Sequence, residues 1–164
     1  MAMRSTFKMQ GFTLIEVMVV IGLVAFLLTL GIPLAREWVL SAHQREAKGA
    51  LDEALGRAKA LALRNPQGLT DQTLPAAAVC LTAGKLVVVP ATAQKITCDT
   101  KAEWAQSLPS DATIVLTKTN IPFQCVAYNE RGVALVTTVS NLSCLQAGLD
   151  VNVASEEAFF VQLP

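Results

Sequence analysis

The chain begins with a short polar stretch and then becomes almost wholly apolar. After residues 1–11, the sequence runs without a charge over residues 17–35, and one carboxylate, Glu16, lies just ahead of that run. A run of about nineteen residues is roughly 28 Å long as a helix, which just spans the hydrocarbon core of a bilayer. We therefore predict a hydrophobic, membrane-spanning helix over residues 12–35.

Helical periodicity continues beyond this run. Pro33 should kink the helix, because proline removes a backbone donor and clashes with the preceding turn. Beyond it, small and apolar side chains recur at spacings of three and four, which predicts an amphipathic helix over residues 36–65. The predicted apolar face is Leu51, Ala54, Leu55, Ala58, Leu61 and Ala62. Glu53 and Arg57 stand in the favourable i,i+4 order, and the Asn-Pro-Gln-Gly sequence at residues 65–68 ends the helix.

From residue 66 onward the pattern predicts strands. Apolar and β-branched residues recur in short runs that are separated by turn residues. The expected strands are 77–81, 86–89, 112–118, 123–128 and 133–139, with weaker ones at 150–153 and 158–162. A turn at residues 129–132 should join two of them as a hairpin, with Gly132 at a position of positive φ. We therefore predict an α+β fold, in which a long N-terminal helix packs on an antiparallel, β-rich domain over residues 66–164.

Composition and cysteines fit one domain plus an apolar anchor. The chain has 164 residues, of which 52% are hydrophobic and 16% charged, and its formal charge is zero, so bulk charge does not favour a polyanionic partner. Four cysteines, Cys80, Cys98, Cys125 and Cys144, lie in the distal part, which predicts two disulfides in an oxidising compartment. Of the three possible connectivities we favour Cys80–Cys98 and Cys125–Cys144, whose short loops are each worth roughly 3 kcal/mol. Free buried thiols are the alternative.

The junction between the polar leader and the apolar run carries the most specific signal. A secretory signal peptide is cut after its apolar region. Here the only plausible junction, between Gly11 and Phe12, precedes that region, so the helix would stay in the mature protein. The sequence Gln-Gly-Phe-Thr-Leu-Ile-Glu-Val at residues 10–17 resembles the type III signal of the type IV pilin superfamily. Gly11, Phe12 and Glu16 stand where that family has its cleavage glycine, first mature residue and glutamate, and Pro33 stands where many pilins have a helix-bending proline.

The resemblance implies processing, export and assembly. It implies that a prepilin peptidase cuts after Gly11 and methylates Phe12. Because Arg4 and Lys8 in the leader should stay cytoplasmic, it also implies a single-pass protein of the bacterial inner membrane, with a periplasmic C-terminal domain, that later enters a pilus or pseudopilus. Other pilins or pseudopilins are the implied partners, with Glu16 paired to the Phe12 amine of a neighbouring subunit. A carboxylate that snorkels to the membrane interface is the alternative for Glu16.

The distal pattern is similar to that of minor pilins and pseudopilins with a GspH/FimT-type domain. The similarity rests on the Ala-Leu-Arg-Asn helix end at residues 62–65, the strand that carries Cys80, and the Asn-Glu-Arg-Gly turn at residues 129–132. It implies a minor pilin that primes or joins type IV pili. The alternative is an H-type minor pseudopilin of a type II secretion system. DNA capture, which some members perform with a basic C-terminal segment, is disfavoured because no Lys or Arg follows Arg131.

No residue pattern indicates an enzyme, a cofactor or a metal. His43, the single histidine, should be a solvated helix residue. The cysteines lack the CxxC spacing of zinc or thioredoxin-like sites. Asp99, Glu103 and Asp111 could cluster around calcium, but they lack the regular spacing of a calcium loop, so solvated loops are expected. We therefore expect a non-catalytic structural subunit without a cofactor.

Overall fold

The computed structural model describes residues 12–92, 96–98, 101–117, 119–153 and 157–163, without the side chains of Leu30, Pro33 and Leu34. The predicted leader, residues 1–11, lies outside this part, and so does Gly11 at its end. The chain divides into two compact units, Met1–Val39 and Leu40–Pro164.

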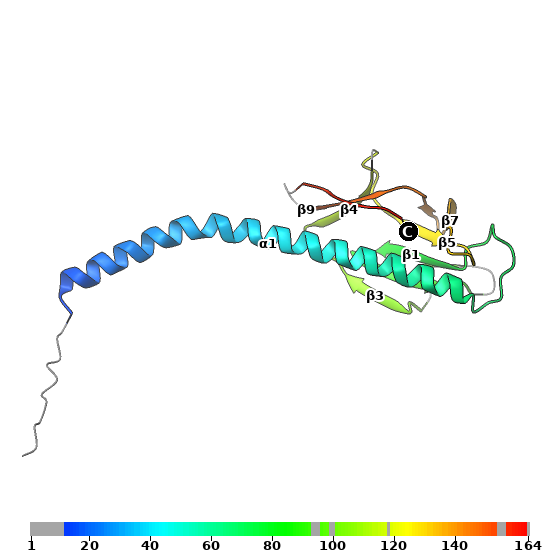
Figure 1. The fold of residues 1–164 in the computed structure, drawn as a ribbon, viewed down its shortest axis with the longest axis horizontal. Coiled ribbons are helices and arrows are strands. Elements are labelled where there is room, and N and C mark those ends of the chain that lie inside the picture. Colours follow the sequence, from blue (N-terminus) through cyan, green and yellow to red (C-terminus); the bar gives the residue numbers. More distant parts are fainter. Residues whose placement is uncertain (1–11, 93–95, 99–100, 118, 154–156, 164) are drawn as a thin grey trace, which may run out of the picture. The chain divides into compact units, whose positions relative to one another are not determined.

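One helix and ten strands make up the regular structure of the described residues (Figure 1). The helix, α1, spans Leu14–Arg64. The strands are β1 (Ala77–Thr82), β2 (Lys85–Pro90), β3 (Trp104–Ser107), β4 (Ala112–Leu116), β5 (Cys125–Tyr128), β6 (Ala134–Leu135), β7 (Thr137–Val139), β8 (Leu142–Cys144), β9 (Leu149–Val153) and β10 (Phe159–Val161). The fold is therefore α+β with mostly antiparallel sheets, as predicted.

The first unit exposes apolar side chains along its helical length. From Phe12 to Ile32, the described large apolar side chains are between 47% and 81% exposed. Among the described residues, no helical stretch combines the length and the apolarity that a bilayer crossing requires. The span predicted over residues 12–35 is therefore not confirmed. Helical structure continues through Pro33, and the kink predicted there stays a prediction.

In the second unit, α1 buries one stripe of side chains, and this is the stripe that the sequence predicts. Its members, between 0% and 6% exposed, are Leu51, Ala54, Leu55, Ala58, Leu61 and Ala62. They share one hydrophobic core with residues of several strands, while Arg57 and Glu53 pair on the exposed side at 2.7 Å. The helix ends as predicted, because Asn65 adopts a φ of 43° and its side-chain amide exchanges two hydrogen bonds with the backbone of Leu69 (2.7 and 2.8 Å).

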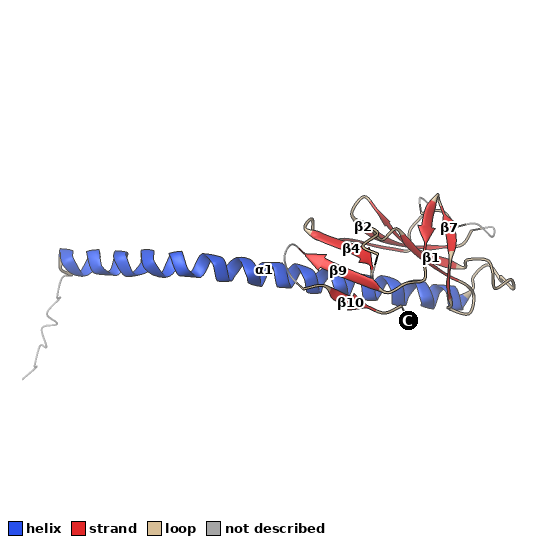
Figure 2. Ribbon diagram, turned by 90° about the horizontal axis from the view of Figure 1, so that it is seen from above, coloured by secondary structure: helices blue, strands red, loops and turns tan. Residues whose placement is uncertain are grey.

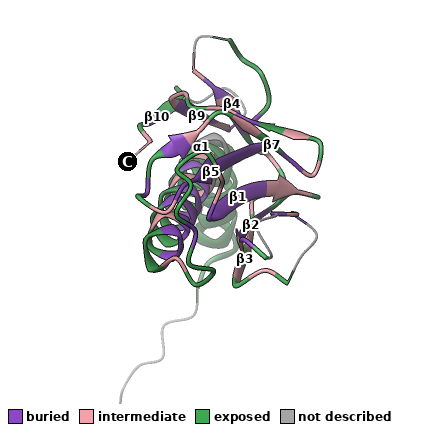
Figure 3. Ribbon diagram, turned by 90° about the vertical axis from the view of Figure 1, so that its right-hand side faces the viewer, coloured by how far each residue is buried: buried purple, intermediate pink, exposed green. Residues whose placement is uncertain are grey.

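Two sheets complete the second unit. The larger has the strand order β3-β2-β1-β5-β8-β7, with β6 beside β5, and the smaller has the order β10-β9-β4. Neighbouring strands are antiparallel except for β5 and β8, which are parallel. Figure 2 shows the strands lying along the second-unit part of α1, and Figure 3 shows the buried ribbons of β1 and β5 beside the helix. The core therefore lies between the helix and the sheets.

Two disulfides fasten the larger sheet. Cys80 in β1 is bonded to Cys98, with a Cα–Cα distance of 6.0 Å. Cys125 in β5 is bonded to Cys144 in β8, with a Cα–Cα distance of 4.5 Å, and these two residues are also register partners in the parallel pair. All four cysteines are buried. These are the two pairings that short loop length favours.

The hairpin expected over residues 123–139 is much shorter than predicted. Strands β5 and β6 pair only at Ala127 with Leu135 and at Tyr128 with Ala134. The following residue, Val136, is 71% exposed, and β7 then pairs with β8 instead of β5. The physical reason is the disulfide, which holds β8 beside β5 in the position that a longer hairpin would occupy. Gly132 has the positive φ that was expected, 72°.

Candidate processing and assembly site

Thr13 caps the helix directly after the predicted cleavage junction. Its carbonyl oxygen accepts hydrogen bonds from the backbone N–H groups of Glu16 (3.1 Å) and Val17 (3.3 Å). Its hydroxyl oxygen also accepts from the Glu16 N–H (3.3 Å). A threonine with a glutamate three residues later is the capping-box pattern, which satisfies backbone donors that the first helical turn leaves open. Local sequence therefore starts α1 just beyond the junction. Thr13 was not identified from the sequence, although its spacing of three residues from Glu16 is the capping-box pattern and could have indicated it.

The Glu16 carboxylate has no partner within the described part of the chain. Glu16 is exposed, and it lies in the first turn of α1, where the helix dipole favours a negative charge. Phe12, four residues earlier, is 81% exposed, so the predicted first mature residue and the carboxylate lie at the same helix end. Because a carboxylate is a strong acceptor for a cationic donor, Glu16 can bind an ammonium group from outside its own chain.

His43 is a helix residue with a partly exposed side chain (39%), as expected, but it also has a partner that the sequence did not reveal. Its ring Nδ1 lies 3.1 and 3.0 Å from the two carboxylate oxygens of Asp111. This hydrogen bond lowers the pKa of Asp111 below its ordinary value. The adjacent Gln44 is 2% exposed and donates to the carbonyl oxygens of Val151 (3.2 Å) and Glu157 (2.6 Å). Both residues thus connect α1 to the smaller sheet. Their partners are 68 or more positions away in the sequence, so local sequence patterns could not reveal these contacts.

The residues considered for calcium do not come together in the described structure. Asp99 lies outside the described residues, and Asp111 pairs with His43. Glu103 lies away from that pair, in a pocket that is also lined by Arg57 and Arg64. Within the described ranges, no three His, Cys, Asp or Glu side chains gather as metal ligands would. The described structure therefore supplies no candidate metal site.

Arg131, the cation closest to the C-terminus, is engaged within the second unit. Its Nε lies 3.5 Å from Glu130 Oε1. With its amide oriented to suit its surroundings, Gln72 accepts from both terminal guanidinium nitrogens of Arg131 (2.8 and 3.2 Å). The turn itself rests on Asn129, which is buried, and whose side-chain oxygen accepts from the N–H groups of Arg131 (3.1 Å) and Val133 (2.9 Å). Arg131 therefore belongs to a turn that is stabilised by side-chain hydrogen bonds and an ion pair.

The C-terminal segment carries acidic residues, in contrast to the basic segment that DNA capture would need. Asp150 accepts a hydrogen bond from Thr117 Oγ1 (3.0 Å), Glu157 is exposed, and Glu156 lies outside the described residues. Since affinity for DNA comes mainly from clustered cations, this arrangement gives no support to DNA capture.

Tyr128 is the largest fully buried side chain of the second unit. Its hydroxyl has no hydrogen-bond partner among the described residues, and burial raises its pKa to about 12. A phenol in this environment stays protonated and serves the core, so it is not a candidate acid or base at neutral pH.

The comparisons with known proteins concern the N-terminal region alone. Residues 6–32 match the prokaryotic N-terminal methylation motif, which is the signal of type IV pilins and pseudopilins. The match begins within the predicted leader and includes Gly11, Phe12 and Glu16. No curated protein and no solved structure matches the chain.

Proposed function

We propose that the protein is a minor pilin that primes type IV pili or is incorporated into them. One observation carries the proposal: the methylation motif at residues 6–32 coincides with a helix whose described large apolar side chains are 47% to 81% exposed from Phe12 to Ile32. A helix that is apolar all round needs a covering of lipid or of other helices. Packing against the equivalent helices of other pilins in a filament provides that covering.

Processing and assembly are coupled in this proposal. Prepilin peptidase cuts after Gly11 and methylates Phe12, which leaves a positively charged amine at the start of the helix. Glu16 has no partner among the described residues, and a buried carboxylate is costly unless it is paired. Pairing Glu16 with the Phe12 amine of a neighbouring subunit removes this cost, and it favours one stagger between adjacent helices.

Before assembly, the protein would reside in the inner membrane with its second unit in the periplasm. The two disulfides, Cys80–Cys98 and Cys125–Cys144, support an oxidising compartment for that unit. The role proposed is structural and non-catalytic, with the second unit selecting neighbouring subunits. A minor pseudopilin of a type II secretion system is the alternative, because it carries the same N-terminal signal.

Mass spectrometry of the tagged protein captured from its native cells tests this proposal. We expect an N-terminal methylated Phe12 together with co-purified type IV pilins. Co-purified secretion-system pseudopilins would replace the minor-pilin assignment with the alternative. An intact Met1 terminus without filament partners would contradict both.

A further inference from the structure

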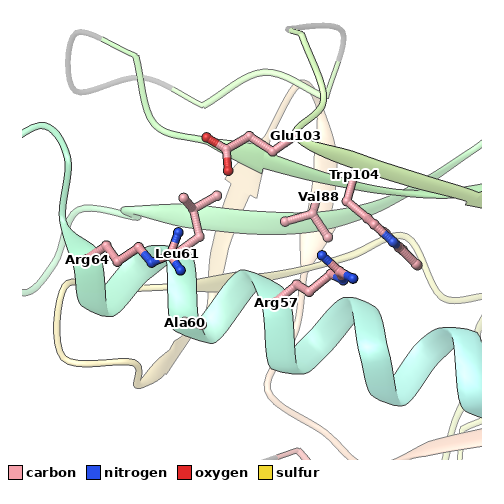
Figure 4. Close-up of a pocket in the computed structure, with 7 residues that line it drawn as sticks. All are labelled: Arg57, Ala60, Leu61, Arg64, Val88, Glu103 and Trp104. Carbon is pink, nitrogen blue, oxygen red and sulfur yellow. The ribbon is translucent and has the colours of Figure 1, made fainter.

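A small pocket in the second unit lies between α1 and the edge of the larger sheet. Its volume is about 120 Å³, and it is lined by Arg57 and Arg64 from α1, by Trp104 at the start of β3 and Glu103 just before it, and by apolar atoms of Leu61 and Val88. Figure 4 shows the Glu103 carboxylate turned toward the helix, with Leu61 between it and Arg64. A space of this size admits one side chain.

One wall of the pocket is already fixed. Arg57 donates to Glu53 Oε1 through Nε (2.8 Å) and through Nη2 (2.7 Å). Its guanidinium also lies over the Trp104 ring, 5.6 Å from the centroid, in a cation–π contact. Arg57 and Glu53 neutralise each other, so this wall offers shape and little net charge.

The other two charged groups remain unpaired. Arg64 and Glu103 line the same pocket, yet neither side chain has a hydrogen-bond or ion-pair partner within the described ranges, and they do not pair with each other. Arg64 offers N–H donors only, and Glu103 offers acceptors only. The pocket thus has a free donor and a free acceptor on different walls, with no net charge between them.

A ligand that suits these walls carries one acceptor and one donor and no net charge. Arg64 and Glu103 are both exposed to solvent, so neither needs a protein partner. An anion that binds Arg64 would face the like charge of Glu103, and a cation that binds Glu103 would face that of Arg64. We propose that this pocket receives an uncharged amide side chain, Asn or Gln, whose carbonyl accepts from Arg64 and whose NH₂ donates to Glu103. Leu61 and Val88 contact its methylene carbons.

The position of the pocket indicates how the amide arrives. Strand β3 is the terminal strand of the larger sheet and pairs only with β2 among the described strands. Such an open edge accepts an extended segment by strand addition, in which neighbouring pockets select the side chains. The partner is therefore an extended segment of a neighbouring subunit, and only this identification rests on the proposed function.

Three small probes of similar size and different charge test the pocket itself. The chain has two tryptophans, so Trp38→Phe leaves Trp104 as the sole indole reporter, in the full chain in detergent micelles. We expect propionamide at millimolar concentration to change the Trp104 fluorescence saturably. Propionate and propylammonium should bind about tenfold more weakly, because propionate is repelled by Glu103 and propylammonium by Arg64.

A charge exchange provides the matched control. Arg64→Glu and Glu103→Arg should each abolish the propionamide response, whereas the double variant should restore it, because an amide can bind in the reverse orientation. Lys85→Glu, an exposed cation at the start of β2, should leave the response unchanged, and unaltered thermal unfolding would show that each variant folds. Preferred binding of propionate or propylammonium, or no saturable response to any probe, would overturn the proposal. N-terminal processing, measured by mass on the same samples, can remain intact in that case, so failure here is distinguishable from failure of the proposed function.

Discussion

The two parts of α1, up to Val39 in the first unit and from Leu40 in the second, differ in how far their apolar side chains are exposed to solvent. In the first unit, Leu28 is 62% exposed, whereas Leu51 in the second unit is fully buried. Between Val17 and Ile32, the first part exposes all of its described large apolar side chains, and no described residue of the chain covers them. The second part confines its apolar residues to one stripe, and the sheets of the same chain cover that stripe. The second unit therefore covers its own apolar stripe, whereas the described apolar side chains of the first unit remain exposed.

Their charges differ in the same way. The second part of α1 pairs its own charges along the helix, Lys48 with Asp52 at 2.7 Å and Arg57 with Glu53 at 2.7 Å. The first part has Glu16 in its opening turn, and this carboxylate has no partner among the described residues. Under the proposed assembly, Glu16 becomes buried and then needs a cationic partner, whereas the surface ion pairs of the second part contribute little.

The largest expected effect is on processing, at the start of the first unit. Gly11→Arg should block cleavage entirely, because a long side chain prevents the close backbone approach that glycine allows. An uncut precursor of full mass, detected by mass spectrometry of membranes, is the expected result. Gly22→Ala is the matched control, since an added Cβ there meets no atom within 4 Å. Normal cleavage of the Gly11→Arg variant would remove the basis for assigning the junction.

Replacing one leucine in each part of α1 tests the comparison directly. Leu51→Ala should destabilise the second unit by about 2–5 kcal/mol, because it leaves a cavity in the core. Leu28→Ala should leave the unfolding of the second unit unchanged, because Leu28 belongs to the first unit. Chemical unfolding of the full chain in detergent, followed by near-ultraviolet circular dichroism, measures both. Equal effects would mean that the two parts are not energetically separate.

Each disulfide should stabilise the second unit by a free energy similar to the one that Leu51→Ala removes. The two bonds span sequence separations of 18 and 19 residues, so loop entropy predicts about 3 kcal/mol for each. Paired serine replacements, Cys80→Ser with Cys98→Ser and Cys125→Ser with Cys144→Ser, remove one bond at a time without leaving a free thiol. If the denaturant midpoints of the two variants differ strongly, loop closure does not account for the stabilisation, and the pairing of β5 with β8 makes the larger contribution.

The smallest expected effect concerns pH. The pKa of Asp111 lies below its ordinary value of 3.8, chiefly because His43 donates a hydrogen bond to it. The stability that this carboxylate contributes is therefore complete above that ordinary value and is lost as the pH falls through the lower, folded value. The difference in melting temperature between the parent and Asp111→Asn should consequently shrink on acidification. Glu46→Gln, an exposed helix position, serves as the control, and a difference that grows in acid would contradict the assigned cause.

Regular periodicity explains why much of the fold was predictable. Leu51, Leu55 and Ala58 recur at helical spacing, and the structure buries all three. The strand around Cys80 and its partner β2 are runs of β-prone residues. Short local loops likewise favoured the cysteine pairing that the structure contains.

The elements that escaped prediction lack such periodicity. Strand β3 has only the four residues Trp-Ala-Gln-Ser, of which Trp104 alone is a strong strand former, so composition does not distinguish the strand from a loop. Strand β8 has three residues, and its parallel pairing to β5 occurs at the single position Cys144. The contact between His43 and Asp111 joins residues 68 positions apart. These features follow from tertiary structure, which local sequence does not encode.

Incorporation of the Glu16→Ala variant into surface filaments tests the central claim most directly. The variant would be compared with the parent and with Glu37→Ala, a matched replacement at an exposed position later on α1, by quantifying each protein in sheared filaments and in membranes. We predict that Glu16→Ala is cut after Gly11, forms both disulfides and remains in the membrane, while Glu37→Ala enters filaments like the parent. Filament incorporation of Glu16→Ala at the parental level would contradict the account.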